Sequence, residues 1–407
     1  MKRLLTTALL VGAATLMPLR LAVAARHDQT PAAEAAADAR PLAHPGAGPA
    51  SDARFVGHVF LIVLENQSFD VTFGKRSPAP YLAKTLRDQG ALLRNYYGIG
   101  HSSLDNYIAL VSGQAPNEQT QGDCPIVTEF KLSQPALDAH GQALGTGCVY
   151  PAIVMSLPDQ LEAAGLTWKG YMEDMGNVPA RESSTCGRSP LNSQEKSYVS
   201  VRGDKYAARH DPFIYFHRIV DDAKRCNSHV VNLDRLPKDL QSIESTPNFT
   251  FISPNLCNDG HDAQCVDGKP GGFQAIDSFL QAWVPRILDS PAYKQDGVLI
   301  ITFDESDSAG PEASTACCGE KPLPGARQAP GFNGPGGGRI GAVLLSAFIK
   351  PGTVSTVPYN HYSLLRWVED QFGLAHLGYA GEAGLRTFGS DVFTARADLP
   401  AKSSPSP

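Results

Sequence analysis

The chain has 407 residues, of which 42% are hydrophobic and 19% are charged, and it contains 8 cysteines. The hydrophobic fraction is large enough for an extensive core, which excludes wholesale disorder. The formal net charge of −6 argues against a protein that coats nucleic acid.

The N-terminal segment has the pattern of a secretory signal peptide. Lys2 and Arg3 precede an apolar run from Leu4 to Leu16, and the small residues Ala22, Val23 and Ala24 follow. The apolar run is shorter than the roughly 18 residues that a membrane span needs. We therefore predict a signal peptide over residues 1–24, cleavage near Ala24, a periplasmic or secreted mature protein, and no stable membrane anchor.

The remaining chain predicts one domain with two unstructured flanks. Residues 25–53 are rich in Ala and Pro without apolar periodicity, which predicts a flexible leader. Residues 396–407 predict a disordered tail. Residues 54–395 contain neither a second linker nor an internal repeat, so we predict a single domain there.

All eight cysteines lie after the predicted signal peptide, in a compartment where disulfides form. Cys257 and Cys265 are near enough in sequence to close a small loop, and Cys124 with Cys148 a larger one. The other pairings remain open. Zinc binding is disfavoured, because no paired C-x-x-C spacing occurs.

Apolar runs that alternate with helical patterns predict an α/β fold. Continuous apolar runs predict buried strands at His58–Leu64, Leu166–Tyr171, Asn248–Ile252, Gly297–Phe303 and Ile340–Phe348. Helical spacing predicts helices at Pro80–Leu93, Leu104–Ser112, Ala275–Leu288 and Tyr362–Phe372. The order indicates a mostly parallel central sheet with helices on both faces, whose function lies at the carboxyl ends of the strands.

Acidic residues follow two of these strands directly. Glu65 and Asn66 follow the strand that ends at Leu64, and Asp304 and Glu305 follow the strand that ends at Phe303. Carboxylate and amide oxygens are ligands for hard divalent cations, so this pattern predicts a metal site on neighbouring strands. The alternative is a glycosidase-like acid pair formed by Glu65 and Glu305.

Seven short motifs occur in an order that identifies a family resemblance. They are ENQSFD at 65–70, GHSSLDNY at 100–107, GLTWK at 165–169, RHDPF at 209–213, SPN with NDGHD at 253–262, FDE at 303–305 and NHYSLLR at 360–366. The chain resembles the bacterial phosphoesterase family of acid phosphatases and phospholipases C, within the alkaline-phosphatase-like superfamily. The resemblance implies an alkaline-phosphatase-like fold and covers nearly the whole predicted domain.

The resemblance also implies roles for individual residues. Glu65, Asn66, Asp304 and Glu305 would hold a divalent metal ion of unknown identity. Thr167, in the Gly-x-Thr-Trp motif, would be the nucleophile that takes the phosphoryl group. His101, His210 and His261, together with Asp259, would act on the phosphate oxygens and the leaving group.

Each of these residues also has an ordinary structural explanation. Without the resemblance, Thr167 would be interpreted as an ordinary β-branched strand residue. A threonine hydroxyl also needs a metal or a base to become nucleophilic. His101 fits a helix N-terminus and His210 a turn, whereas a Cys257–Cys265 disulfide would fix His261 in position. His361 opens the last predicted helix, and its role stays open.

The leading hypothesis is an exported, metal-dependent phosphomonoesterase that forms a phosphothreonine at Thr167. The main alternative is a phospholipase C that cleaves phospholipid headgroups, and a third is a non-catalytic exported binding protein. The expected partners are a small phosphate ester or a phospholipid headgroup, and the oligomeric state stays open. Because Cys257 and Cys265 bracket His261, and Cys317 and Cys318 follow Glu305, we expect disulfides to hold active-site loops.

Overall fold

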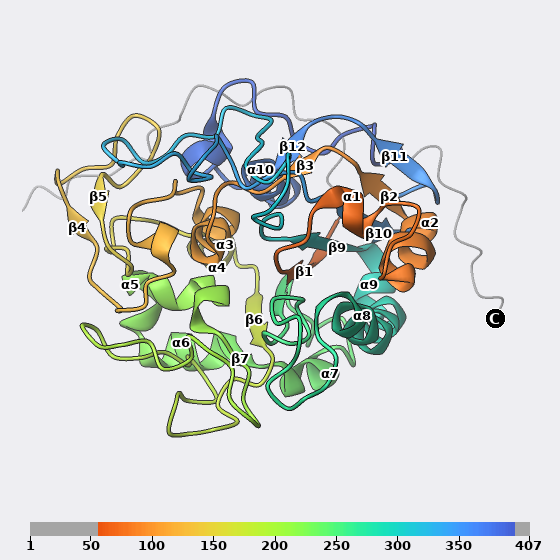
Figure 1. Ribbon diagram of the computed structural model, residues 1–407, viewed down its shortest axis with the longest axis horizontal. Helices are drawn as coiled ribbons and strands as arrows, with labels where there is room; N and C mark the ends of the chain where they lie inside the picture. The colour runs from red at the N-terminus through yellow and green to blue at the C-terminus, as the bar shows by residue number, and fades with distance from the viewer. Residues whose placement is uncertain (1–55, 395–407) are drawn as a thin grey trace, which may run out of the picture. The chain divides into compact units, whose positions relative to one another are not determined.

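The computed structural model describes residues 56–394 (Figure 1). The predicted signal peptide, leader and C-terminal tail lie outside the described residues. Within them, the side chains of the central sheet and of the surrounding helices form one large hydrophobic core.

Eight strands make up the central sheet. Their bounds are β1 (His58–Leu64), β2 (Ala91–Leu93), β6 (Trp168–Met172), β7 (Val230–Asn232), β8 (Phe249–Ser253), β9 (Gly297–Phe303), β10 (Ala342–Ser346) and β11 (Thr353–Ser355). They lie in the order β11-β2-β10-β9-β1-β8-β6-β7. The strands from β9 to β7 are parallel to one another, whereas β10 is antiparallel to β9 and β2. The predicted α/β class with a mostly parallel sheet is confirmed.

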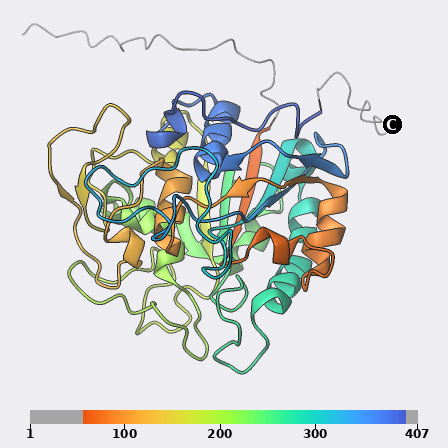
Figure 2. The same ribbon diagram turned by 45° about the horizontal axis from the view of Figure 1, so that its top comes forward.

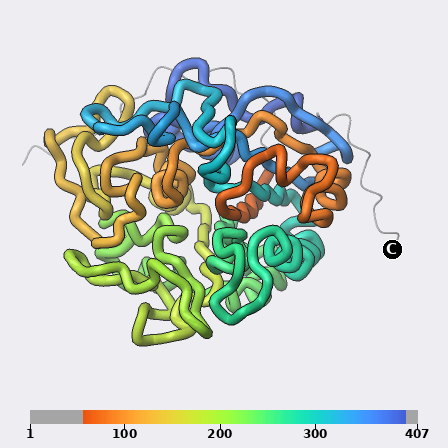
Figure 3. Tube along the Cα trace, in the orientation of Figure 1, coloured from red at the N-terminus to blue at the C-terminus, as the bar shows by residue number. Residues whose placement is uncertain are grey.

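Two further pairs of short strands lie outside the central sheet. They are β3 (Tyr96–Tyr97) with β12 (Tyr359–Asn360), and β4 (Lys131–Leu132) with β5 (Gly145–Thr146). In Figure 3, the yellow-orange connection that carries β4 and β5 runs out from the sheet before the chain returns to it.

Helices cover both faces of the sheet. The α-helices are α1 (Phe69–Thr72), α2 (Arg87–Gln89), α3 (Ser103–Ser112), α4 (Leu157–Ala163), α5 (His217–Val220), α6 (Ala223–His229), α7 (Leu236–Asp239), α8 (Gly272–Asp289), α9 (Pro291–Asp296) and α10 (His361–Phe372). A π-helix spans Tyr81–Leu86, and short 3-10 helices span Thr120–Gly122, Ala208–His210, Pro212–Tyr215, Leu233–Arg235 and Gly378–Gly381. Helices α3 and α10 lie on one side and α8 on the other (Figure 1, Figure 2). Across the described part of the chain, no helix combines the length and apolar character needed to cross a membrane.

The strands with continuous apolar runs match their predicted bounds best. Strands β1 and β9 begin and end at the predicted residues, and every residue in both is buried. Burial on both faces explains the continuous run, because a parallel sheet with helices on each side has no solvent-facing side. The two strands pair in register from His58 with Gly297 to Leu64 with Phe303, so the adjacent placement that we expected is confirmed.

The prediction of one helix over Pro80–Leu93 is wrong at its C-terminal end. The helical segment stops at Gln89, and residues 91–93 form β2. Gly90 marks the change, because a Cβ atom there would lie 2.0 Å from the carbonyl oxygen of Leu344 on β10. The chain therefore needs a glycine where it enters the sheet.

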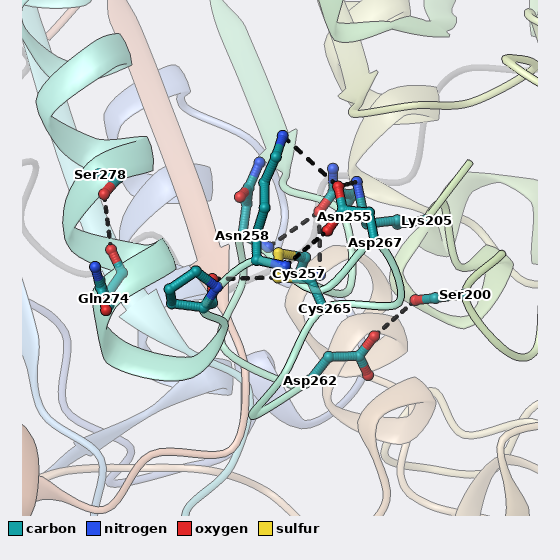
Figure 4. Close-up of a disulfide and its surroundings, with 12 residues drawn as sticks. Ser200, Lys205, Asn255, Cys257, Asn258, Asp262, Cys265, Asp267, Gln274 and Ser278 are labelled. Carbon is teal, nitrogen blue, oxygen red and sulfur yellow. Dashed lines mark hydrogen bonds and ion pairs between the residues drawn. A yellow bond between two sulfur atoms is a disulfide. The ribbon is translucent and has the colours of Figure 1, made fainter. Parts of the chain in front are cut away.

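Four disulfides occur in the described residues, and two of them were predicted. Cys124–Cys148 and Cys257–Cys265 confirm the expected pairs. The pairings that the sequence left open are Cys186–Cys226 and the adjacent pair Cys317–Cys318. Figure 4 shows the Cys257–Cys265 loop, where Asp262 accepts a hydrogen bond from Ser200 and Lys205 pairs with Asp267.

Candidate active site

The carboxyl ends of β1 and β9 bring Glu65 and Asp304 together. Each residue directly follows its strand, and both are fully buried. The backbone N–H of Asn66 donates to Asp304 Oδ1 at 3.0 Å, which joins the two strand ends. Asn66 has a φ of 58°, a left-handed conformation that asparagine tolerates better than most residues. The strand ends therefore form a fixed acidic floor.

Helix α3 places a serine against this floor. Ser103, the first residue of the helix, donates from Oγ to Glu65 Oε2 at 2.9 Å. One turn further, the hydroxyl of Tyr107 donates to Glu65 Oε1 at 2.7 Å. Both oxygens of Glu65 thus accept a hydrogen bond from α3. Ser103 is only 4% exposed, so bulk water hardly reaches its hydroxyl.

His210 and Asp259 lie on the other side of Glu65. His210 Nε2 is 3.3 Å from Glu65 Oε1, and its Nδ1 is 3.2 Å from Asp259 Oδ2. The imidazole stacks on Tyr107 with an interplanar angle of 4°. One ligand atom from each of Glu65, His210 and Asp259 falls within 4.8 Å of the others, and all three residues are buried. The structure therefore unites the predicted His210 and Asp259 with the predicted Glu65.

His101 forms a separate pair with Glu305. His101 Nδ1 lies 2.9 Å from Glu305 Oε2, and Nε2 lies 2.6 Å from the carbonyl oxygen of Ala313. Asn106 Nδ2, on α3, approaches the same Glu305 oxygen at 3.4 Å. The aromatic ring of Phe332 stacks on His101 at 6.3 Å and is 40% exposed. An oxygen atom thus lies near each nitrogen of His101, and these two contacts position its ring.

Arg209 brings positive charge to the rim of the site. One guanidinium nitrogen lies 3.1 Å from His261 Nε2, and Nε lies 3.7 Å from Asp123 Oδ2. Asp123 in turn accepts a hydrogen bond from the backbone N–H of Leu104 at the start of α3. The side chain of His261 is 35% exposed, so this side of the site meets solvent. Arg209 is therefore buried at the edge of the acidic floor, and His261 beside it reaches solvent.

The acidic floor carries more negative charge than its surroundings neutralise. Burial raises the pKa of Glu65 well above its ordinary value, and the charges of Asp304 and Asp259 raise it further. Burial likewise raises the pKa of Asp304 to about 6, and it raises the pKa of Asp259 and of Glu305. Arg209 opposes the shifts at Glu65, Asp259 and Glu305. Such a set favours a bound cation or bound protons.

The donor set fits a divalent metal ion. Asp304 Oδ2, Asp259 Oδ2 and both ring nitrogens of His210 are buried and have no hydrogen-bond partner within residues 56–394. Carboxylate oxygens and a neutral imidazole are common ligands for divalent ions. Burial and the charges of Arg209 and His261 lower the pKa of His210, which keeps its imidazole neutral. Asn66 and Glu305 belong to the same centre, although the Asn66 amide donates to Glu65 and Glu305 pairs with His101.

The structure contradicts the placement of Thr167 in this site. Thr167 directly precedes β6. Its hydroxyl donates to Asn248 Oδ1 and accepts from the Asn248 backbone N–H, and Asn248 directly precedes β8. In the sheet register, Trp168, Phe249 and Val59 lie side by side, whereas Glu65 comes six residues after Val59. At about 3.3 Å per residue, the two ends of the sheet are roughly 20 Å apart. Thr167 is exposed at the amino end and cannot be the nucleophile of this centre.

His361 supports the floor from behind. It is fully buried at the start of α10, and its Nε2 lies 2.6 Å from the backbone carbonyl oxygen of Asp304. Its Nδ1 lies 3.1 Å from the hydroxyl of Tyr96. Burial lowers the pKa of His361 to about 4, so the ring is neutral at ordinary pH. His361 therefore fixes the backbone that carries Asp304.

Sequence reasoning missed four residues that the structure places at the centre. They are Ser103, Tyr107, Asp123 and Arg209. A signal was present for three of them, because Ser103 and Tyr107 lie in the GHSSLDNY motif and Arg209 lies in the RHDPF motif. Asp123 had no such signal, since it lies outside these motifs and reaches the site only through the tertiary fold.

The sequence profile of a family described as the Phosphoesterase family matches residues 76–375. A probable acid phosphatase from Kluyveromyces lactis is 25% identical over 80% of this chain and 61% of its own length. A phosphatidylinositol-3-phosphatase from Mycobacterium tuberculosis is 26% identical over 80% of both chains. An acid phosphatase from Aspergillus fumigatus is 23% identical over 72% of this chain and 51% of its own length. The chain thus spans only about half to three fifths of the two fungal relatives.

Similar folds occur among solved structures at low sequence identity. A protein of the alkaline phosphatase superfamily from Vibrio parahaemolyticus has a TM-score of 0.43 and 11% identity, over 79% of this chain and 67% of its own. The PsFucS1 sulfatase from Pseudoalteromonas has a TM-score of 0.45 and 14% identity, over 78% and 68% of the two chains.

Proposed function

We propose a function that proceeds from one fact: this chain belongs to the Phosphoesterase family. The protein hydrolyses phosphate monoesters through a covalent phosphoserine at Ser103. One observation carries the proposal, namely the hydroxyl of Ser103 held 2.9 Å from Glu65 Oε2 at the buried start of α3. This nucleophile replaces Thr167, which lies at the opposite end of the sheet.

The chemistry takes two displacements at phosphorus. In the first, Ser103 Oγ forms a bond to the phosphorus atom while the bond to the leaving alcohol oxygen breaks. The Ser103 proton passes to Glu65 Oε2, which returns it when Ser103 is restored, and His101 protonates the leaving oxygen as the alcohol departs. In the second, water attacks the phosphoserine, inorganic phosphate leaves, and the Ser103 hydroxyl is restored.

Residues at the rim supply charge for the phosphate oxygens. The guanidinium of Arg209 is buried beside the acidic floor, between the carbonyl oxygen of Tyr198 and the ring of His261, and it brings a positive charge to this side of the site. His261 is next to it and partly exposed. Phosphoryl transfer depends mainly on positioning and on neutralising negative charge, which these two side chains provide.

His101 is the proposed proton donor to the leaving group. Its Nδ1 lies 2.9 Å from Glu305 Oε2 and its Nε2 lies 2.6 Å from the Ala313 carbonyl oxygen, and these contacts position the ring. The exposed ring of Phe332 stacks on His101 and borders the position of the leaving alcohol. The proton balance closes when His101 regains its proton from the water that hydrolyses the phosphoserine.

A divalent metal ion would be held by Glu65, Asp304, Asp259 and His210. When bound, such an ion neutralises charge on phosphate oxygens and makes a serine hydroxyl more acidic. The raised pKa values of the three carboxyl groups and the unpartnered atoms of Asp304, Asp259 and His210 support this assignment. The identity of the metal stays open.

Monoester hydrolysis is favoured over phospholipase C activity by the similar proteins. Several are named acid phosphatases, and another is named phosphatidylinositol-3-phosphatase. These names describe hydrolysis of monoesters, including a monoester on a lipid headgroup. The four disulfides favour an oxidising compartment, which agrees with the predicted export.

A panel of phosphate esters tests the proposal on the full-length protein. We expect phosphate release from p-nitrophenyl phosphate and from a phosphoinositide monoester, and little product from p-nitrophenylphosphorylcholine. Chelation should abolish activity, and one divalent metal of a panel should restore it. Activity confined to p-nitrophenylphosphorylcholine would establish the phospholipase alternative instead. Ester binding without turnover would establish the non-catalytic alternative.

A further inference from the structure

The disulfide Cys317–Cys318 joins adjacent residues, with a sequence separation of 1. A disulfide stabilises a fold mainly by closing a long loop in the unfolded chain. A bond between neighbours closes no such loop, so global stability does not explain this one. Both cysteines are partly buried. We therefore consider a local role, in which the bond fixes the backbone conformation at residues 317 and 318.

The adjacent disulfide is packed against a buried carboxylate. The backbone N–H of Cys318 donates to Glu320 Oε2 at 3.0 Å, and Cys317 Sγ lies 3.7 Å from Glu320 Oε1. Cys317 Sγ also lies 3.3 Å from the carbonyl oxygen of Tyr359. Glu320 is only 8% exposed. The conformation at Cys317–Cys318 therefore determines where the carboxylate of Glu320 lies.

Glu320 holds the residue that begins α10. Its Oε1 accepts a hydrogen bond from Asn360 Nδ2 at 2.8 Å. Asn360 caps α10 with its other amide atom, because Asn360 Oδ1 accepts from the backbone N–H of Ser363 at 3.0 Å. The Ser363 hydroxyl completes a capping box with the Asn360 backbone. One side chain thus connects Glu320 to the helix start.

The first residue of α10 connects this segment to the acidic floor. His361 follows Asn360 directly and bonds the backbone carbonyl oxygen of Asp304 at 2.6 Å. The contacts are continuous from Cys317–Cys318 through Glu320, Asn360 and His361 to Asp304. Every contact in this series is within hydrogen-bond distance or is a covalent neighbour.

We propose that the Cys317–Cys318 disulfide and Glu320 form a positioning unit for Asp304, acting through Asn360 and His361. The disulfide fixes the turn that presents the Cys318 N–H to Glu320, and the helix start then holds the backbone at Asp304. Residues that orient a ligand from behind commonly change activity by 10-fold to 100-fold. The proposal rests on the proposed function only for its activity measurement.

The test compares two double variants of the full-length protein. C317A/C318A should lower kcat for p-nitrophenyl phosphate about 10-fold and leave the melting temperature nearly unchanged. The control is C186A/C226A, because that disulfide joins α6 to the loop after β6, beside β7 at the far edge of the sheet. The control should lower the melting temperature and keep kcat. Equal kcat in wild type and C317A/C318A would overturn the proposal.

A double-mutant cycle tests whether the disulfide and Glu320 act as one unit. Glu320→Gln keeps the size of the side chain but replaces one acceptor oxygen with a donor. We expect the variant to lower kcat, and its combination with C317A/C318A to lower kcat no further than the stronger single change. Fully multiplicative losses would mean that the two act separately, and would contradict the proposal.

A measurement that needs no activity separates this proposal from the proposed function. In protein with ¹⁵N-labelled histidine, the His361 Nε2–H that bonds Asp304 should give a protected, downfield proton signal. We expect the signal to weaken in C317A/C318A and to persist in C186A/C226A. If wild type hydrolyses no ester, the proposed function is wrong, while the His361 signal still decides this proposal. An unchanged signal in C317A/C318A would refute it.

Discussion

At the residue scale, the position of one hydroxyl decides the mechanism. Ser103 is buried at the start of α3 and donates to Glu65, whereas Thr167 is exposed and bonds Asn248 at the amino end of the sheet. A nucleophile must lie within reach of the groups that activate it. Of these two hydroxyls, that of Ser103 lies within reach of Glu65 and that of Thr167 does not.

Ser103→Ala should therefore abolish turnover, with a loss of about 10³-fold or more in kcat. Thr167→Ala is the matched control, since it removes the other candidate hydroxyl, at the opposite end of the sheet. It should keep kcat and cost about 1 kcal/mol of unfolding free energy, from the lost hydrogen bonds to Asn248. Steady-state kinetics measures kcat, and denaturant unfolding measures the unfolding free energy. Mass spectrometry of phosphate-trapped enzyme identifies the residue that carries the phosphoryl group. A phosphothreonine at residue 167 would reverse the assignment.

The sequence predicted the position of the acidic residues correctly but not that of the candidate nucleophile. The acids were located correctly, because Glu65 and Asp304 follow strands whose apolar runs are unmistakable. Thr167 was misplaced by a motif match, although it precedes its strand and a parallel strand directs its first residue away from the acids. Ser103 lies on a helix, and its approach to Glu65 depends on packing that local patterns do not encode.

At the scale of elements, disulfides fix segments that carry site residues. The Cys257–Cys265 loop contains Asp259 and His261, and Asp259 Oδ1 accepts the backbone N–H of His261 at 2.8 Å. The hydrogen bond from the Glu65 backbone N–H to the Asp259 carbonyl, at 2.9 Å, ties the loop to the end of β1. The loop is therefore part of the site rather than of the distant surface.

Removing this disulfide should cost more activity than its small loop suggests. In the loop-entropy model, C257A/C265A loses about 2–3 kcal/mol and C186A/C226A about 4 kcal/mol, since their separations are 8 and 40. Activity should change in the opposite order, with a clear loss of kcat only in C257A/C265A. Thermal unfolding and ester hydrolysis at 25 °C give the two rankings. The same ranking in both measurements would mean that activity merely follows stability.

Long strands that are buried along their whole length were predicted with the most accurate bounds. Strands β1 and β9 were predicted to the residue, whereas the short β2 was assigned to a helix, because three residues carry too little pattern to reveal a strand. The disulfides Cys124–Cys148 and Cys257–Cys265 were predicted, whereas the adjacent pair Cys317–Cys318 was not. Cys186–Cys226 depends on the loop after β6 lying beside β7, where the Cys186 N–H bonds the Val230 carbonyl group. Long-range pairing needs the tertiary fold.

At the scale of the whole molecule, the buried acids couple stability to pH. Asp304 has a pKa of about 6 in the folded protein, against about 4 in an unfolded chain. Between these values the unfolded chain has released its proton and the folded protein has not. Stability from this group therefore falls as pH rises from about 4 to about 6, by about 3 kcal/mol, and then stays level. His210, with its lowered pKa, acts in the opposite direction, since its contribution is lost as pH falls below about 6.5.

A bound divalent cation should remove the penalty from the acids, because it replaces the protons. In chelator-treated protein, adding the activating metal should raise the melting temperature more at pH 7.5 than at pH 5. Asp304→Asn isolates the effect: without metal its melting temperature at pH 7.5 should equal or exceed that of wild type, and the metal-induced rise should shrink. Calorimetry of wild type and of Asp304→Asn, each with and without the metal, measures these melting temperatures at both pH values. A metal-induced rise that is the same at both pH values and in Asp304→Asn would mean that the ion binds elsewhere.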